Sequence, residues 1–167
     1  MAAAAAAELG TDAGKVLVSS TGVIGVQLPV EKIETGVRGM AAELRGDPLV
    51  GAEGIMTTDT HPKALSATVG DATITWVAKG SGMIEPNMAT MLAYIFTDAA
   101  LDAATLDRLL RRAVDVSFNM LSVDTDTSTS DTCVIMANGL AGAVDEQAFC
   151  DALVAGCVRM TEILARD

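Results

Sequence analysis

The sequence predicts a mixed α and β fold in which helices pack in layers on a sheet. Apolar runs typical of strands alternate along the chain with segments whose apolar residues recur every three or four positions. Gly70-Asp71 separates two β-rich runs, which favours a hairpin and argues against a purely parallel sheet. Half of the 167 residues are hydrophobic but only 3% are aromatic, so we expect a core of Ala, Val, Leu, Ile and Met.

The first half of the chain is predicted to hold one helix among short strands. Residues 15–21, "KVLVSST", form an apolar strand that runs into a Thr-Gly turn. Pro29 then opens a helix of about four turns. The apolar face of this helix comprises Val30, Ile33, Val37, Met40 and Leu44. Residues 53–59 are strand-like, and residues 64–80 form the predicted hairpin.

The second half is predicted to add two strands and two helices. Residues 90–96 are an apolar strand, and residues 101–118 carry leucines at helical spacing. A polar loop, 124–132, precedes a strand over 133–139. The last element is a helix whose apolar residues, at steps of three and four, are Phe149, Leu153, Cys157, Met160 and Leu164. Neither an internal repeat nor a linker divides the chain, so we expect one domain.

Charge and cysteine usage exclude several classes of partner. The formal net charge of −11 repels phosphate backbones, which argues against nucleic acid. No apolar run approaches the ~20 residues of a membrane helix, so we expect a soluble protein that does not enter a membrane. Cys133, Cys150 and Cys157 are an odd number without a CxxC pair. Reduced thiols, two of them on nearby faces of one helix, and a cytoplasmic chain are therefore predicted.

Thr90 stands at the junction of a loop, "GSGMIEPNMA", and the apolar strand that follows it. Its hydroxyl could attack the carbonyl of Ala89, and hydrolysis of the resulting ester would leave Thr90 at a new N-terminus. The freed α-amine, whose unperturbed pKa is about 7.7–8.0, could then act as general base for its own hydroxyl. This chemistry needs a small preceding residue, a strained and flexible approach, and a group that stabilises the developing oxyanion, and the segment offers the first two. The alternative is a β-branched residue that simply starts a strand.

Four motifs occur in a single order and at consistent spacing: "SSTGVIG", "GIMTTDTHPK", "AKGSGMIEPNMATMLAYIFTDA" and "SFNMLSVDTDTSTSDTCVIMANG". From about Lys15 to the last residue the chain closely resembles the glutamate N-acetyltransferases, also called ornithine acetyltransferases, which are bifunctional enzymes of arginine biosynthesis. The resemblance implies a layered fold of the ornithine-acetyltransferase type, a cytoplasmic enzyme, and no metal or organic cofactor. It also implies an α2β2 assembly.

The resemblance implies a reaction centred on Thr90. Members of the family cleave themselves at an Ala-Thr bond, which matches Ala89–Thr90 here. Thr90 would take an acetyl group from N-acetylornithine as an ester and would then pass it to glutamate. Some relatives also use acetyl-CoA as the donor.

Four further residues match positions with roles in that family. Thr21 and Gly22 match the oxyanion-hole pair, in which a hydroxyl and a backbone N–H converge on one oxygen. Thr57 and Lys79 match substrate-binding residues. A cation at Lys79 can pair with an amino-acid carboxylate and can disfavour protonation of the Thr90 amine.

Cleavage would divide the polypeptide into residues 1–89 and residues 90–167, which we expect to share one domain. Full members of the family are longer at both ends. The Ala-rich start and the stop after a helix at Asp167 likewise suggest truncated termini. A catalytically incompetent fragment of the transferase, with exposed edges, is therefore an alternative. Glu162 lies near the place of a family glutamate, but it belongs to a helix and is not given that role.

Other interpretations involve the same segments. Asp124 and Asp126 follow an apolar strand, as in haloacid-dehalogenase-like phosphatases, but no lysine follows residue 132 to complete such a site. A calcium loop fails because Thr129 and Ile135 stand where the turn Gly and the bidentate Glu belong. Instead, we expect the loop to organise polar groups near the site. His61, the single histidine, is predicted to lie in a surface loop. A self-processing aminopeptidase, which passes its acyl group to water, is an alternative enzyme class.

Overall fold

The structure is a computed structural model that describes residues 1–84, 91–124 and 128–167. The chain forms two compact units, Met1–Gly46 and Asp47–Asp167. The predicted mixed α and β class is confirmed, because the unit of residues 47–167 combines a four-stranded sheet with packed helices.

Short helices and turns make up the unit of residues 1–46. Its elements are α1 (Ala2–Leu9), η1 (Ala13–Lys15), α2 (Val30–Val37) and η2 (Met40–Glu43). The amino group of Met1 lies 3.4 Å from Glu34 Oε1, and the backbone N–H of Ala41 donates to Glu8 Oε1 at 3.2 Å. Within this unit, all of which is described, Ala6 is the one residue classed as buried.

Two predictions for this unit are wrong. Residues 15–21 do not form a strand, since the paired strands of the described structure all lie beyond residue 62. The helix from Pro29 ends at Val37, far short of its predicted length. Arg38 turns to extended backbone with ψ 127°, and Gly39 follows at φ 82°. That left-handed conformation suits glycine and ends the helix.

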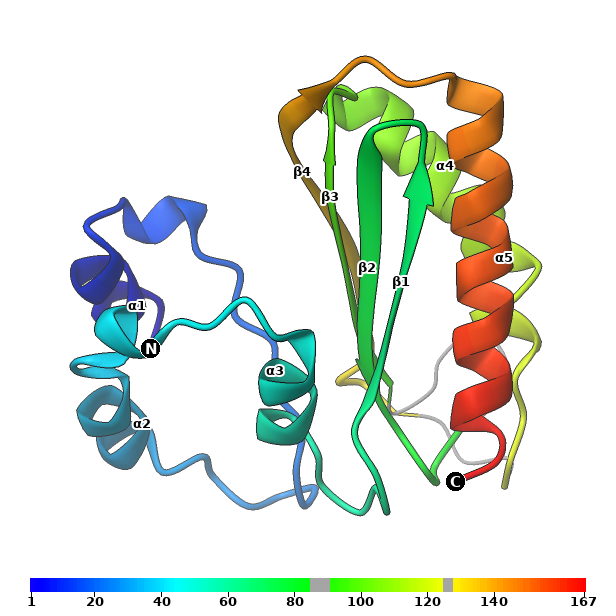
Figure 1. The fold of residues 1–167 in the computed structure, drawn as a ribbon. Coiled ribbons are helices and arrows are strands. Elements are labelled where there is room, and N and C mark those ends of the chain that lie inside the picture. Colours follow the sequence, from blue (N-terminus) through cyan, green and yellow to red (C-terminus); the bar gives the residue numbers. More distant parts are fainter. Residues whose placement is uncertain (85–90, 125–127) are drawn as a thin grey trace. The chain divides into compact units, whose positions relative to one another are not determined.

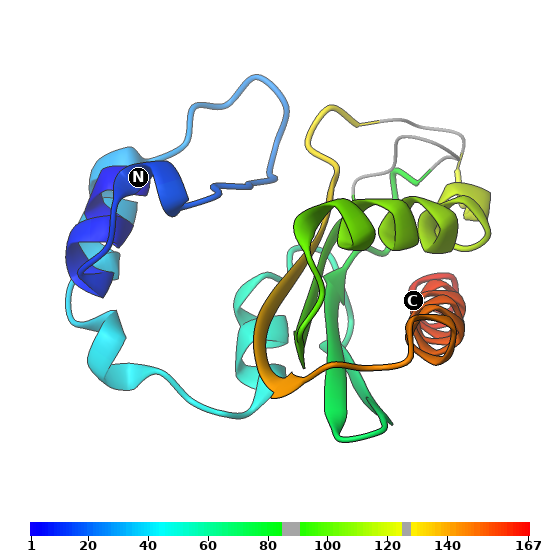
Figure 2. The same cartoon turned by 90° about the horizontal axis from the view of Figure 1, so that it is seen from above.

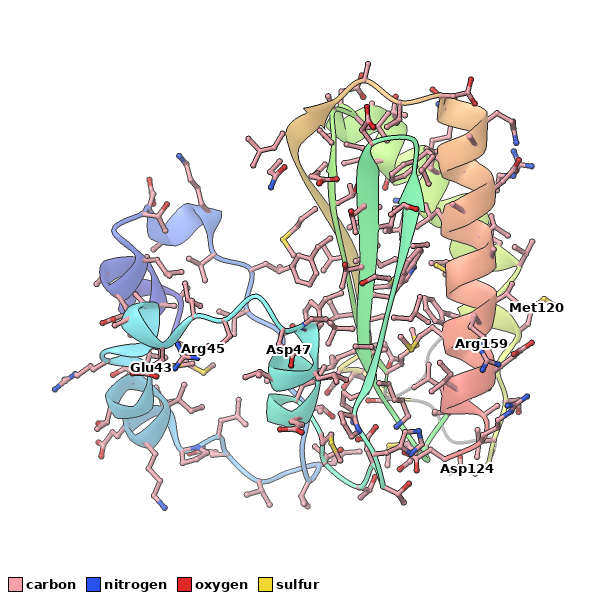
Figure 3. The ribbon with its side chains drawn as sticks, viewed as in Figure 1. Glu43, Arg45, Asp47, Met120, Asp124 and Arg159 are labelled. Atoms are coloured by element: carbon pink, nitrogen blue, oxygen red, sulfur yellow. The ribbon has the colours of Figure 1, made fainter. Side chains whose placement is uncertain are left out.

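The strand predicted over residues 53–59 is also wrong, because a helix occupies its first part. This helix, α3 (Pro48–Gly54), follows Asp47, which is labelled in Figure 3. Asp47 Oδ1 accepts a hydrogen bond from the backbone N–H of Leu49 at 2.9 Å. Pro48 sits in the first turn, where its missing N–H costs nothing. The Asp-Pro pair is a helix-start signal, and it outweighs the apolar character of the segment.

Four strands form one sheet, in the order β1-β2-β3-β4. They are β1 (Lys63–Val69), β2 (Ala72–Lys79), β3 (Leu92–Ala99) and β4 (Thr132–Gly142). β2 runs antiparallel to both of its neighbours, β1 and β3, whereas β4 runs parallel to β3 (Figure 1). Gly70, at φ 59°, and Asp71 form the two-residue turn of the predicted hairpin. The strands predicted over 90–96 and 133–139 correspond to β3 and β4.

The sheet carries helices on both faces. The remaining elements are α4 (Ala103–Asp115), η3 (Phe118–Met120) and α5 (Glu146–Leu164). α4 and α5 cover one face, and α3 lies against the other face over β1 and β2 (Figures 1 and 2). Asp102 caps α4 by accepting from Thr105 N at 2.8 Å, and Asp145 caps α5 by accepting from Ala148 N at 2.8 Å. Both long helices were expected from their spacing. No helix in the described ranges combines the length and apolarity needed to cross a bilayer.

Aliphatic and sulfur-containing side chains fill the layer between the sheet and the two long helices. Trp76, 1% exposed, lies at its centre and pairs across the sheet with Ile95. The other large, fully buried apolar side chains of this core include Ile74, Leu109, Phe149, Leu153 and Met160. Cys150 and Cys157 are buried free thiols, as predicted. Burial raises the pKa of the Cys157 thiol to about 11, which keeps it protonated and unreactive at neutral pH.

One end of each of the four strands lies at the same end of the sheet. The register pairs Lys63 with Ala78, Lys79 with Leu92, and Leu92 with Thr132. β1, β3 and β4 therefore begin where β2 ends. Chain segments that are far apart in sequence meet at this end, and two of the predicted site residues, Thr57 and Lys79, lie there.

Candidate active site

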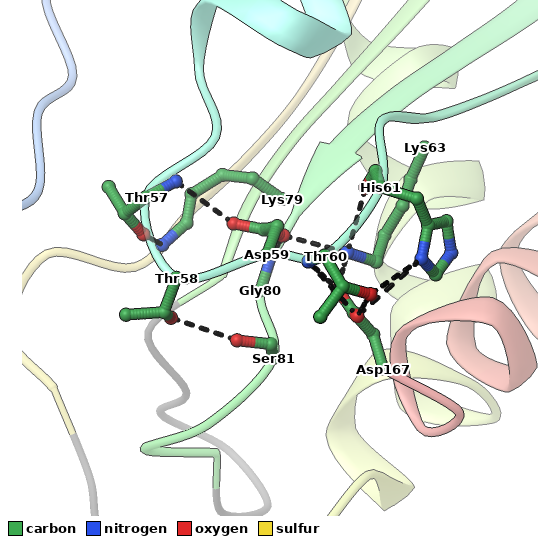
Figure 4. A network of polar contacts seen from close by, with 10 residues as sticks. All are labelled: Thr57, Thr58, Asp59, Thr60, His61, Lys63, Lys79, Gly80, Ser81 and Asp167. Carbon is green, nitrogen blue, oxygen red and sulfur yellow. Dashed lines mark hydrogen bonds and ion pairs between the residues drawn. The ribbon is translucent and has the colours of Figure 1, made fainter.

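Lys79, the last residue of β2, lies buried at this end of the sheet with 3% of its surface exposed. Its ammonium group donates a hydrogen bond to Thr57 Oγ1 at 2.9 Å (Figure 4). Thr57 comes from the turn between α3 and β1. The fold thus joins the two residues that the resemblance predicts to bind substrate. An ammonium beside a hydroxyl offers charge-assisted hydrogen bonds to a carboxylate.

Asp59 connects the two segments that carry this pair. Its Oδ2 accepts a hydrogen bond from the backbone N–H of Thr57 at 3.1 Å. Its Oδ1 accepts one from the backbone N–H of Gly80, the residue after Lys79, at 2.6 Å. One carboxylate therefore fixes the backbone at Thr57 and immediately after Lys79, and so sets the distance between their side chains.

Lys63 supplies the charge that balances Asp59. Lys63 is 1% exposed, and its Nζ lies 2.7 Å from Asp59 Oδ1. The same ammonium also contacts the carboxylate of Asp167 at the end of α5 (Figure 4). Asp167 in turn accepts from the backbone N–H of Thr60 at 3.1 Å. The buried ammonium of Lys63 thus has a carboxylate partner on two sides, so its own charge is compensated.

His61 lies at the outer edge of this network. Its ring is 48% exposed, and its Nδ1 is 3.1 Å from Thr60 Oγ1. The prediction of a surface loop is therefore confirmed. Among the described residues, His61 does not contact Lys79 or Thr57.

The charges of the network perturb one another. Burial acts to raise the pKa of Asp59, but hydrogen bonds from Lys63, Gly80 and Thr57 outweigh it and hold that pKa below its ordinary value. Burial lowers the pKa of Lys79, an effect that the charge of Asp59 opposes and the charge of Lys63 reinforces. Lys79 is thus a cation whose protonation depends on its carboxylate neighbours.

Asp124 holds the chain that leaves Lys79. Its two carboxylate oxygens accept from the backbone N–H groups of Met83, at 2.6 Å, and Ile84, at 2.9 Å. Met83 has φ 58°, a left-handed conformation that is strained for a residue other than glycine. Both oxygens of Asp124 are committed to backbone, so the carboxylate is not presented as a nucleophile of the phosphatase type. Asp124 therefore orders the backbone of Met83 and Ile84, and the wider role expected of its loop stays a prediction.

The remaining predicted site residues belong to other parts of the chain. Thr21 and Gly22 belong to the unit of residues 1–46, whereas Lys79 belongs to the other unit. Ala89 and Thr90 lie outside the described residues. Their roles stay predictions. The described ranges contain no cluster of three or more His, Cys, Asp or Glu that could hold a metal ion.

Asp59 and Lys63 are site residues that sequence reasoning missed. Both stand in the quoted motif "GIMTTDTHPK", four positions apart. A lysine and an aspartate at the start of a strand ordinarily indicate solvated charges. Their pairing is evident only in the folded chain, where β2 and the residues that follow α5 bury them.

A comparison with family models decides the wider class of this protein. The model described as the ArgJ family matches residues 1–167, which is the full chain. The chain belongs to the ArgJ family. This confirms the resemblance drawn from the four motifs, and it excludes the phosphatase interpretation of the Asp124 loop.

Individual relatives in the ArgJ family are close in sequence. The chain is 54% identical over 149 residues to "Arginine biosynthesis bifunctional protein ArgJ 2" of Nostoc sp., an overlap of 89% of this chain and 38% of the relative. It is 50% identical over 161 residues to the ArgJ 2 protein of Clostridium acetobutylicum, covering 96% of this chain and 42% of that one. It is 48% identical over 167 residues to "Glutamate N-acetyltransferase Oat2" of Streptomyces clavuligerus, covering 98% and 42%. The chain thus spans about two fifths of the length of these ArgJ relatives.

Proposed function

We propose that this protein is a glutamate N-acetyltransferase of arginine biosynthesis, which moves an acetyl group from N-acetylornithine to glutamate. The observation that carries the proposal is the hydrogen bond of 2.9 Å from Lys79 Nζ, which is buried, to Thr57 Oγ1. These residues were predicted from the resemblance to bind substrate, and they come from separate segments. The printed names of the ArgJ relatives, among them a glutamate N-acetyltransferase, support the same reaction.

The proposed mechanism has two stages. In the first, the hydroxyl of Thr90 attacks the carbonyl of Ala89, the peptide nitrogen leaves as the α-amine of Thr90, and water hydrolyses the ester that joins the two parts. In the second, Thr90 Oγ takes the acetyl group of N-acetylornithine and releases ornithine. The amine of glutamate then attacks the acetyl ester, which regenerates the hydroxyl and gives N-acetylglutamate.

The binding residues have separable roles in this scheme. The Lys79 ammonium would bind the α-carboxylate of the amino-acid substrate, with the Thr57 hydroxyl as its neighbour. Thr21 and Gly22 would donate to the oxyanion that forms at the acetyl carbon. The scheme needs no metal or organic cofactor. Acetyl-CoA is a possible second donor, and nucleic acid and membrane have no part in it.

The sheet supports the idea that the two cleaved parts stay together. β2 precedes residues 85–90 and β3 follows them, and the two strands pair along their length from Ile74–Thr97 to Lys79–Leu92. A cut between Ala89 and Thr90 would therefore leave parts 1–89 and 90–167 joined by one sheet. An α2β2 assembly in the cytoplasm is the form we propose for the whole protein.

Intact-mass analysis of the protein, expressed at its full natural length, tests the proposal. We expect two polypeptides that divide between Ala89 and Thr90, and a single polypeptide for Thr90→Ala. Transfer from N-acetylornithine to glutamate is expected to fall at least about a thousandfold in Thr90→Ala, because the nucleophile is lost. Thr68→Ala, at an exposed position on β1, is the matched control and should cleave and transfer normally.

The same assay separates the transferase from the aminopeptidase alternative. A transferase forms N-acetylglutamate only when glutamate is supplied. Release of free acetate at the same rate with and without glutamate would instead indicate a hydrolase. An uncleaved wild-type protein that transfers nothing would support the incompetent-fragment alternative.

A further inference from the structure

Asp131 lies at the start of β4, beside the first described residue after the predicted cleavage point. Its Oδ1 accepts a hydrogen bond from the backbone N–H of Met91 at 2.9 Å. The carbonyl of Met91 accepts in turn from the backbone N–H of Thr132 at 3.0 Å. Met91 is covalently bonded to Thr90, so Asp131 and Thr132 together bind both polar backbone groups of the residue next to the predicted nucleophile.

The second oxygen of Asp131 is buried without a hydrogen-bond partner among the described residues. A buried carboxylate oxygen without a partner costs free energy, so such a group calls for a functional explanation. Lys79 is the charged group that acts on Asp131 in the described structure, and each of the two charges favours the ionised form of the other. The free oxygen is therefore electrostatically coupled to the ammonium predicted to bind substrate.

Asp124 and Asp131 accept hydrogen bonds from the backbone on either side of residues 85–90. Asp124 binds the N–H groups of Met83 and Ile84, and the backbone N–H of Val123 donates to the carbonyl of Ile84 at 2.8 Å. Asp131 binds Met91. Two carboxylates from the loop 124–132 thus anchor the chain where it enters and where it leaves residues 85–90.

We propose that Asp131 is a positioning residue of the acetyl-transfer site, with a separate task for each oxygen. Oδ1 fixes the backbone of Met91, and Oδ2 presents a negative charge that keeps Lys79 cationic for the substrate carboxylate. The proposal rests on the proposed transferase function and adds to it a residue that acts through Met91 and Lys79.

The ionisation of Asp131 supplies a readout specific to this role. Burial raises the pKa of Asp131 to about 6, against the opposing effects of the Met91 hydrogen bond and the Lys79 charge. Above that pH the carboxylate is charged and supports the Lys79 cation, which also faces Asp59 and Lys63. Below that pH the Asp131 carboxylate is neutral and no longer stabilises the Lys79 cation. Substrate affinity is therefore expected to improve as the pH rises through about 6.

Three variants of the protein at its natural length separate the two tasks. Asp131→Asn keeps an oxygen that can accept from Met91 but removes the charge, whereas Asp131→Ala removes both. Asp71→Asn, in the exposed hairpin turn, is the matched control. We expect Asp131→Asn to cleave normally. At about pH 8 its KM for N-acetylornithine should be about tenfold higher than that of the wild type, while its kcat stays within about threefold. Its KM should no longer change near pH 6. Asp131→Ala should in addition slow self-cleavage.

Each outcome bears on the proposal. A wild-type KM and an unchanged pH profile in Asp131→Asn overturn it, while the transferase function itself stands. If Asp131→Asn fails to fold, the wild-type profile decides, because a KM that does not change between about pH 5 and pH 7 also overturns it. A wild-type protein that forms no N-acetylglutamate from N-acetylornithine overturns the proposed function, and the role of Asp131 with it.

Discussion

At the scale of single residues, the site depends on buried charges that balance one another. Lys63 touches no predicted substrate group, yet it neutralises Asp59, which holds the backbone beside Thr57 and Lys79. Both side chains are fully shielded from solvent. Loss of the Lys63 charge leaves the Asp59 carboxylate buried without its ion-pair partner, which is far more costly than loss of an exposed ion pair.

Lys63→Met tests this balance. We expect the free energy of unfolding to fall by about 3–5 kcal/mol at neutral pH, measured by chemical denaturation, because Asp59 keeps a buried charge without its partner. The double variant Lys63→Met with Asp59→Asn should recover part of the loss, since it removes both charges. Arg159→Met, which breaks an exposed ion pair of 2.6 Å to Glu162, is the matched control and should cost less than about 1 kcal/mol.

The same pair gives stability a dependence on pH. The pKa of Asp59 is lowered in the folded state, so its contribution is present above the unfolded value of about 3.9 and is lost as the pH falls through the folded pKa. Asp167, whose pKa falls to about 2 because the Lys63 and Thr60 contacts outweigh burial, acts in the same direction. Wild type should therefore lose stability below about pH 4, and the double variant should lose less. Equal acid sensitivity of the two proteins would contradict this account.

At the scale of elements, α5 packs on the sheet through a glycine. A Cβ placed on Gly156 would lie 2.2 Å from Cζ2 and 2.5 Å from Cε2 of the Trp76 indole. The ring is 1% exposed and packed in the core, so it has little room to move. The absence of a side chain at this one position sets how closely α5 approaches β2.

Gly156→Ala is expected to destabilise the protein, although alanine favours a helix. The gain in helix propensity of about 1 kcal/mol is outweighed by the clash, and we expect a net loss of about 1–3 kcal/mol in thermal or chemical unfolding. Gly51→Ala, in α3, is the matched control: its Cβ would meet no atom within 4 Å. That variant should be neutral or slightly stabilising. A stabilised Gly156→Ala would show that the ring and helix can separate at no cost.

At the scale of the whole molecule, the two compact units differ in what holds them together. The extended cluster of buried apolar residues lies wholly beyond residue 68. In the unit of residues 1–46, by contrast, the buried apolar residue is Ala6, and large apolar side chains are exposed. Examples are Leu17, Val23, Ile24, Val26 and Leu44. Burial of apolar area is the main source of stability, so the units should differ sharply in autonomy.

Separate expression of the two units tests this difference. We expect residues 47–167 alone to unfold in one cooperative thermal transition, followed by near-UV circular dichroism at Trp76. Residues 1–46 alone should show no cooperative transition, because so little apolar area is buried. A gradual, non-cooperative loss of signal for residues 47–167 would mean that the core needs the first unit.

Several predictions from the sequence hold because they rest on local physics. The hairpin at Gly70-Asp71 follows from turn geometry, and the two long helices follow from apolar spacing and from aspartate caps such as Asp102 and Asp145. The family, too, is determined by the sequence, because the spacing of four motifs is a property of the chain alone. The strands predicted over 15–21 and 53–59 fail because apolar character does not distinguish a strand from any other apolar segment without a neighbouring strand to pair with.

The amino-acid sequence alone predicted the class of fold and the family, and its resemblance to that family pointed to Thr57 and Lys79. The folded chain added the contact between these two residues and their connection to Asp59 and Lys63. The physical reason is that the value of a charge depends on its surroundings. An aspartate or a lysine is predicted from sequence to be solvated, and it becomes structural when distant parts of the chain exclude water around it and supply its partners.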